Sequence, residues 1–126
     1  MFLISVLLHL IDDFVLQIAC FSKLKQKQWW IRECEKENIN FLPYKNDYKV
    51  ALFLHGLEWS IMISLPIIMI GNCNDILLGI IVFINAIIHA IIDHIKANLF
   101  KINLIIDQSL HFIQIVFLYA VINFIN

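Results

Sequence analysis

The hydrophobic positions of the chain fall into four long apolar runs, at about residues 2–21, 50–70, 76–95 and 103–125. A transmembrane α-helix needs about 20 mostly apolar residues to cross about 30 Å of hydrocarbon. The runs are continuous and rich in Leu and Ile, without the alternation that a membrane β-barrel requires. The pattern therefore predicts an all-α, integral-membrane four-helix bundle that forms a single domain over residues 1–126.

The composition supports a membrane protein. The chain is 61% hydrophobic and only 15% charged, far from the balance of an ordinary soluble domain. The first run has neither the basic start nor the small-residue cleavage site of a signal peptide, and it contains acidic residues. We therefore expect it to remain as the first span of the mature protein.

The basic residues predict the orientation of the spans. Seven of the nine Lys and Arg residues lie in the first connection, 22–49, and Lys96 and Lys101 flank the third connection. The second connection, GNCND, has none. Because the first and third connections of a four-span protein lie on the same side, the enrichment places both in the cytoplasm and both termini outside.

The first connection also predicts a segment at the membrane surface. Trp29 and Trp30 lie close to Lys23, Lys25 and Lys27, a combination that suits the lipid headgroup layer. We therefore predict an interfacial helix from about residue 22 to 37, with the lipid bilayer as its partner. A solvated loop that only fixes the topology explains the same composition. Acidic residues offset much of the positive charge, so no nucleic-acid partner is expected.

Ionisable side chains inside the apolar runs are the main functional signal. Each charge at bilayer depth costs about 2.5 to 3.5 kcal/mol on insertion scales, so such residues generally have a function. The runs contain ten of them: His9, Asp12, Asp13, His55, Glu58, His89, Asp93, His94, Asp107 and His111.

The spacing of these residues is regular. Three runs each carry a histidine and an aspartate four positions apart, namely His9 with Asp13, His89 with Asp93, and Asp107 with His111. Residues at i and i+4 share a helix face, so each pair can direct two ligand groups to one point. The second run adds His55 and, three positions later, Glu58.

The depth of these residues also agrees between the runs. Counted from the predicted cytoplasmic ends, one layer lies about seven or eight residues deep, near 11 Å, and a second about three to five residues deep. The deeper layer contains Asp13, Glu58, His89 and His111, and the shallower layer contains Gln17, His55, Asp93 and Asp107. The agreement predicts that these side chains converge on one site.

Imidazoles and carboxylates on facing helices are typical ligands of divalent metals. We predict one or two ions, zinc first, with manganese or iron as alternatives. The predicted ligands are His9, Asp13, His55, His89, Asp93, Asp107 and His111. Gln17 and Gln108 are predicted to hydrogen-bond to them. Glu58, Asp12 and Lys96 are the candidate catalytic residues, the first two for proton transfer and Lys96 for substrate charge.

Two other interpretations remain open for the same residues. A single histidine and aspartate pair is also compatible with a buried hydrogen bond that joins helices, and the whole set is compatible with a metal-free route for protons or ions. Lys96 is equally well explained as an anchor at the membrane surface.

Three stretches, HLIDDFVLQ, HAIIDHIK and DQSLH, resemble the motifs HxxxDFxLQ, HxxxDxxK and DQxxH of an uncharacterised family of small bacterial and phage multi-pass membrane proteins. The resemblance covers nearly the whole chain, apart from the Trp-containing first connection. It implies a location in the bacterial cytoplasmic membrane but no established activity. The residues on motif positions are His9, Asp13, Phe14, Leu16, Gln17, His89, Asp93, Lys96, Asp107, Gln108 and His111. The ligand types are more distantly similar to those of membrane-bound metal-dependent hydrolases.

The sequence therefore predicts a membrane-embedded metal-dependent hydrolase that acts on a phosphoester or similar ester at the cytoplasmic face. The substrate would be an anionic lipid or a small phosphorylated molecule. A divalent-cation or proton transporter is the main alternative, although the outer halves of the runs carry few polar residues. A non-enzymatic phage or host membrane factor is the third, and a homo-oligomer is compatible with each.

Overall fold

The computed structural model describes residues 1–17, 19–70 and 74–125, and every regular element in them is a helix. The chain begins with α1 (Phe2–Ile11), which continues into a π-helical turn, η1 (Asp12–Leu16). Two short helices, α2 (Ala19–Leu24) and α3 (Lys27–Lys36), and the 3-10 turn η2 (Leu42–Tyr44) form the first connection. Three long helices follow: α4 (Asp47–Ile70), α5 (Asp75–Ala97) and α6 (Leu104–Ile125).

The three long helices are each long and apolar enough to span a membrane. They correspond to the second, third and fourth predicted spans, and side-chain caps define two of their starts. Asn74 Oδ1 accepts from the backbone N–H groups of Ile76 and Leu77 at the start of α5. Asn103 Oδ1 accepts in the same way from Ile106 at the start of α6. These caps satisfy N–H groups that have no partner within the helix.

The first predicted span, 2–21, is not one continuous helix. α1 and η1 contain 10 and 5 residues, which give at most about 22 Å of helix and fall short of a bilayer core. The helix ends at Gln17, where ψ is 78°, and Ile18 lies outside the described residues. The π turn and the bend after it direct Asp13 and Gln17 toward the other helices. We attribute the break in the helix to these polar residues.

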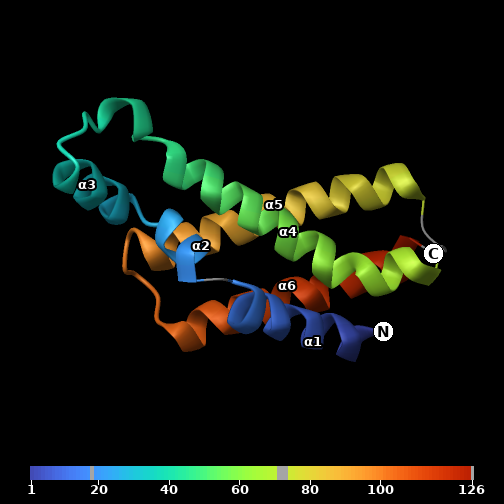
Figure 1. Cartoon of the computed structure of the whole chain (residues 1–126). Helices are drawn as coiled ribbons and strands as arrows, with labels where there is room; N and C mark the ends of the chain where they lie inside the picture. The colour runs from blue at the N-terminus through green and yellow to red at the C-terminus, as the bar shows by residue number, and fades with distance from the viewer. Residues whose placement is uncertain (18, 71–73, 126) are drawn as a thin grey trace.

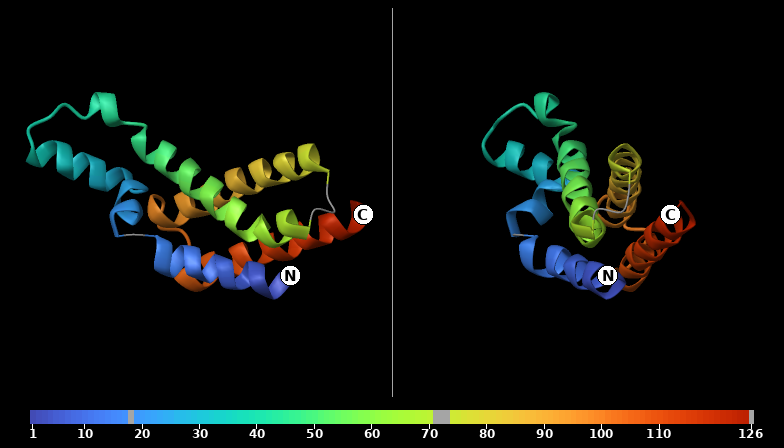
Figure 2. Two further views of the ribbon diagram at one scale, coloured as in Figure 1. Left: turned by 45° about the vertical axis from the view of Figure 1, so that its right-hand side comes forward. Right: turned by 90° about the vertical axis from the view of Figure 1, so that its right-hand side faces the viewer.

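α1 and the three long helices pack side by side (Figure 1). α4 packs most extensively against α5, while α1 contacts α4 and α6, and α5 contacts α6. Gly56 allows the close approach of α4 and α5, since a Cβ atom there would lie 2.5 Å from the backbone oxygen of Ala86. Both termini lie at one end of the helices, and α2, α3 and the connection between α5 and α6 lie at the other (Figures 1 and 2). All nine basic residues therefore lie toward the second end, as the topology argument requires.

The predicted interfacial helix is two helices. α2 and α3 meet at Lys25 and Gln26, and the Trp30 indole N–H donates to the Leu24 carbonyl oxygen at 2.9 Å across this junction. The Trp30 ring also stacks on Tyr44. α3 and the loop after it extend beyond the packed helices (Figure 2). The helical character of the segment is thus confirmed, and its position in the headgroup layer stays a prediction.

The interior has two halves. Toward the termini, apolar side chains form the core, namely Trp59, Ile63, Ile67, Leu78, Ile115, Leu118 and Ile122. Toward the basic end, the interior consists largely of histidine and acidic side chains. Large apolar side chains such as Leu3, Leu7, Ile105 and Phe117 point outward. A polar half of the interior combined with large apolar side chains on the outside is favoured in a hydrocarbon solvent and not in water.

Candidate metal centre

The seven predicted ligands come together at the basic end of the interior. Six contacts between imidazole nitrogens and carboxylate oxygens, at 3.5 to 3.8 Å, link all seven side chains into one network. They come from α1 and η1, α4, α5 and α6, in the order His9, Asp13, His55, His89, Asp93, Asp107 and His111. Six of the seven side chains are buried, and Asp13 is nearly so. The structure therefore brings the seven predicted ligands together, as expected from their spacing.

Asp93 is the central carboxylate of this cluster. Its Oδ2 lies 3.8 Å from His55 Nε2 and 3.7 Å from His89 Nε2, and its Oδ1 lies 3.5 Å from His111 Nε2. Three imidazoles from three different helices thus face one carboxylate. The i,i+4 spacing on α5 places His89 and Asp93 on one face, and Gly56 brings the His55 helix close to that face.

The distances are too long for direct hydrogen bonds, and the two shortest, from His111 to Asp93 and Asp107, fit the spacing of ligands around one ion. Hydrogen bonds between nitrogen and oxygen are about 2.7 to 3.2 Å long, and these contacts are longer. Ligand atoms about 2.0 to 2.2 Å from a tetrahedral ion lie about 3.3 to 3.6 Å from one another. Two groups of side chains could hold such an ion, with ligand atoms within 4.8 Å of one another: Asp13, His55 and His89, and His89, Asp93 and His111.

Several of these atoms have no hydrogen-bond partner in the described part of the chain. They include both ring nitrogens of His89, Nε2 of His111 and Oδ1 of Asp107, all of which are buried. Leaving a buried polar atom without a partner costs about 1 to 3 kcal/mol. A cation at this position would satisfy several of them at once.

Three glutamines orient the cluster. Gln17 donates to His55 Nε2 at 3.1 Å, and Gln108 donates to Asp13 Oδ2 at 2.9 Å and to Asp107 Oδ2 at 3.2 Å. Gln114 Oε1 lies 3.2 Å from His111 Nδ1 and can accept a hydrogen bond from it. In that tautomer, Nε2 of the ring has its lone pair toward the carboxylates. The contacts of Gln108 agree with its predicted supporting role. Gln17, by contrast, donates to the same His55 nitrogen that faces Asp13 and Asp93, and would have to give up this hydrogen bond for that nitrogen to bind a metal.

Trp59 was not singled out from the sequence, although it follows His55 by four residues and so shares its helix face. Its indole N–H donates to His9 Nδ1 at 2.8 Å, and its ring stacks on His89 with centroids 4.3 Å apart. His9 Nδ1 is therefore an acceptor for Trp59, and the neutral ring carries its proton on Nε2. His9 belongs to neither metal-compatible group, and its role as a ligand stays a prediction.

Of the two candidate proton-transfer residues, Glu58 stays outside the cluster, whereas Asp12 is close enough to interact electrostatically with Asp13 and Asp93. Glu58 is exposed, although a residue three positions after His55 lies on a neighbouring part of the same helix face. Asp12 is buried, and its electrostatic neighbours include Glu58 and Lys25. The expectation that the Glu58 side chain converges with the others is thus wrong, and catalysis by Glu58 or Asp12 stays a prediction.

Two lysines pair with two of the three aspartates of the cluster. Lys96 pairs with Asp107 Oδ2 at 2.5 Å, in agreement with a site cation. Lys25 is buried and pairs with Asp93 Oδ2 at 2.5 Å. Nothing in the sequence distinguishes Lys25 from the other lysines of the basic first connection. Asn98 fixes its position by donating to the Lys25 carbonyl oxygen and accepting from the Lys27 N–H.

We expect Lys25→Met to raise the affinity of the centre for zinc by about tenfold. The ammonium competes with a metal ion for Asp93, and removing it leaves a buried carboxylate that gains more from coordination. Competition with a chromophoric chelator measures the change. Lys27→Met, which alters an exposed lysine two residues away, serves as the control. Weaker zinc binding by Lys25→Met would show that Lys25 supports the centre instead.

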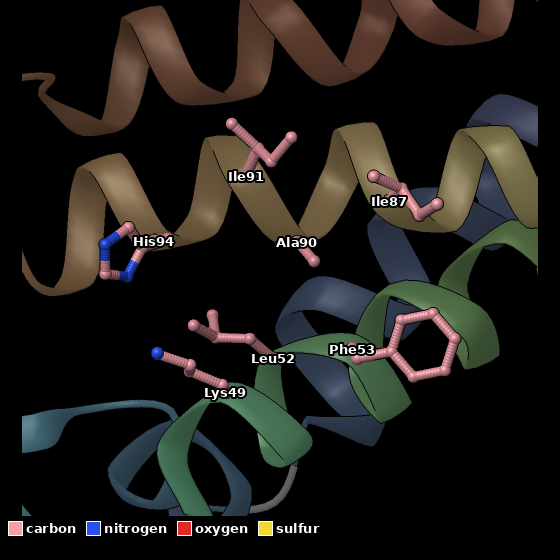
Figure 3. Close-up of a pocket in the computed structure, with 7 residues that line it drawn as sticks. All are labelled: Lys49, Leu52, Phe53, Ile87, Ala90, Ile91 and His94. Atoms are coloured by element: carbon pink, nitrogen blue, oxygen red, sulfur yellow. The ribbon is translucent and has the colours of Figure 1, made fainter. Parts of the chain in front are cut away.

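A separate apolar groove lies between α4 and α5, outside the cluster (Figure 3). His94 and Lys49 lie at one end of it, and Phe53 and Ile87 lie at the other. His94 also stacks against Tyr48, and it takes no part in the contacts that join the seven residues. It is half-buried and thus less solvent-facing than its position near the predicted membrane surface suggests.

Comparison of the chain with protein-family models, curated proteins and solved structures finds no match. The resemblance to the family with the HxxxDFxLQ motif therefore stays a prediction. The geometry of the cluster is the basis for the functional argument.

Proposed function

We propose that this chain is a membrane-embedded hydrolase that uses one or two divalent metal ions at its cytoplasmic end. One observation carries the proposal: imidazoles and carboxylates from four helical elements face one another at ligand-to-ligand distances, with buried atoms that no described residue satisfies. Zinc fits this nitrogen and oxygen donor set, as do manganese and iron.

The two metal-compatible groups share His89, which suggests one ion that settles between them or two ions with His89 at their junction. Asp13, His55, His89, Asp93 and His111 are the ligands that we propose. Asp107 lies next to His111 and would complete the set. A divalent ion here would activate water and polarise an ester. The chain's own part is to hold the donors and to keep the apolar core dry on the far side.

The surroundings of the centre favour hydrolysis over transport. On the side of the termini, Trp59, Ile63, Ile115 and Leu118 are completely or almost completely buried and fill the interior. A path for ions would have to pass through this apolar core. Toward the basic end, by contrast, polar cavities adjoin the centre. These cavities would let a substrate enter and leave the site from the basic end.

We propose further that the three long helices span the bacterial cytoplasmic membrane, with the basic end in the cytoplasm and both termini outside. The short α1 would enter the bilayer from the outer side and end at the level of the centre. It would complete the predicted four-helix bundle without crossing the whole membrane. Because α1 is too short to reach the cytoplasmic surface, it would leave the metal centre open on that side.

The test is hydrolysis by the full chain in detergent. Zinc-loaded protein is expected to release phosphate or an alcohol from at least one phosphoester of a panel, and His89→Ala is expected to lower the rate by about 100-fold or more. Asp75→Ala, at the far end of the same helix, is the control. Turnover that survives both a chelator and His89→Ala would contradict a metal-dependent reaction.

A further inference from the structure

A polar cavity of about 200 Å³ adjoins the metal centre at the basic end. Asp13, Asp93 and Asp107 line its inner side, and Lys25 and Lys96 line it as well. A neighbouring cavity shares Lys25, Asp93 and Lys96 with it and continues past α2. A molecule in the first cavity would therefore contact the acidic ligands of the centre and two ammonium groups at the same time.

The two ammonium groups are at present neutralised by the two acids that a metal would recruit. Lys25 pairs with Asp93 and Lys96 pairs with Asp107, each at 2.5 Å. When a divalent ion takes over these carboxylates, both lysines lose their counter-ions while still lining the cavity. A dianionic group then becomes the complementary occupant. A phosphomonoester, with about −1.5 to −2 charges near neutral pH, has the required charge and acceptor oxygens.

The rim of this cavity is apolar. Phe14 of η1 and Leu104 of α6 line it, with 59% and 52% of their surfaces exposed. Leu104 and Gln108 also line a shallow groove along the outer face of α6, which continues over Ile105, Ser109, Phe112 and Ile113. α6 is one of the three helices suited to a membrane. The polar cavity is thus continuous with a surface that would face lipid chains.

We propose that the cavity and the α6 groove together bind a membrane lipid with a phosphomonoester headgroup. The phosphate lies between Lys25 and Lys96 beside the metal centre, and an acyl chain lies along the groove from Leu104 to Ile113. This assignment rests on the proposed hydrolase function and names its substrate class. A water-soluble phosphate ester would leave the apolar rim and groove without a role.

The test counts lipids bound to the full-length, zinc-loaded protein by native mass spectrometry in detergent. Phosphatidic acid is expected to bind as one molecule per chain and at least about tenfold more tightly than phosphatidylcholine. Ser109→Phe fills the groove and is expected to weaken this binding by about tenfold, the equivalent of about two excluded methylene groups. Ala120→Phe is the matched control, because it adds the same ring to an exposed position on α6 outside the groove.

The headgroup position is tested in the same way. Lys96→Ala is expected to abolish the preference for phosphatidic acid over phosphatidylcholine, whereas Lys49→Ala is expected to leave it intact. Lys49 lies in the separate groove between α4 and α5, so the opposite result would place the lipid there and overturn the proposal. Displacement of the lipid by an equal concentration of glycerol 3-phosphate would also overturn it, since the acyl chain would then contribute nothing.

The outcomes separate this inference from the proposed function. Specific binding of phosphatidic acid without any metal-dependent turnover would support the lipid site and contradict the hydrolase. Metal-dependent hydrolysis of water-soluble phosphoesters, together with equal binding of phosphatidic acid by wild type and Ser109→Phe, would support the hydrolase and contradict the lipid site.

Discussion

Asp93→Asn is expected to lower the affinity of the chain for zinc by more than about 100-fold, beyond the loss typical of residues that only support metal ligands. The side chain keeps its shape but loses the charge that faces His55, His89 and His111. Lys25 also loses its partner, so a buried ammonium would further repel a cation. Competition with a chelator of known affinity measures the change.

Asp75→Asn is the control for this variant. Asp75 also lies on α5 but at its opposite end, where it is exposed, and its substitution is expected to leave zinc affinity unchanged. Circular dichroism should show the same helix content for both variants. Equal affinity of wild type and Asp93→Asn would mean that the central carboxylate does not bind the ion, and the site as described would be wrong.

Gly56→Ala is expected to destabilise the protein by about 1 to 3 kcal/mol, as overpacking of a tight interior does. The new methyl group would lie 2.5 Å from Ala86 O and 3.3 Å from Ala90 N, both in the α5 backbone. Backbone atoms cannot move aside as a flexible side chain would, so α4 and α5 must separate. Because His55 is the neighbour of Gly56 and faces Asp93, we expect weaker metal binding as well. Thermal unfolding in detergent and the zinc titration measure the two effects.

Gly79→Ala provides the matched control, because a Cβ atom at that position on α5 meets nothing within 4 Å. Replacing glycine by alanine in a helix is favourable by about 1 kcal/mol when there is space, so Gly79→Ala is expected to be neutral or stabilising. If Gly56→Ala were as stable as Gly79→Ala, the close approach of α4 and α5 would not be a feature of the folded protein.

The sequence predicted the long helices and the cluster for a common physical reason. Charged residues are costly in apolar segments, so their i,i+4 spacing, as in His89 and Asp93, is an unusually clear signal. The structure confirms three helices of spanning length and brings all seven predicted ligands together. The agreement in height between the runs was sufficient to predict the convergence of these side chains.

Three other features of the structure could not be predicted from the spacing of charged residues in the sequence. The break after η1 depends on a π turn and on the backbone at Gln17, and an apolar run that continues to residue 21 conceals it. Lys25 enters the centre only because α2 turns back toward α5, where Asn98 fixes it. The Glu58 side chain is exposed on α4, and a residue's position along a helix does not by itself indicate which way its side chain faces. Tertiary arrangement decides each of these cases.

The metal content of the purified chain tests the central claim most directly. Protein prepared without chelators should carry at least one zinc, manganese or iron ion per chain by elemental mass spectrometry, and His89→Ala, prepared identically, should carry almost none. His89 is shared by both metal-compatible groups, so its loss should disrupt either arrangement. Wild-type protein with no bound divalent metal, or His89→Ala with as much as wild type, would contradict the account.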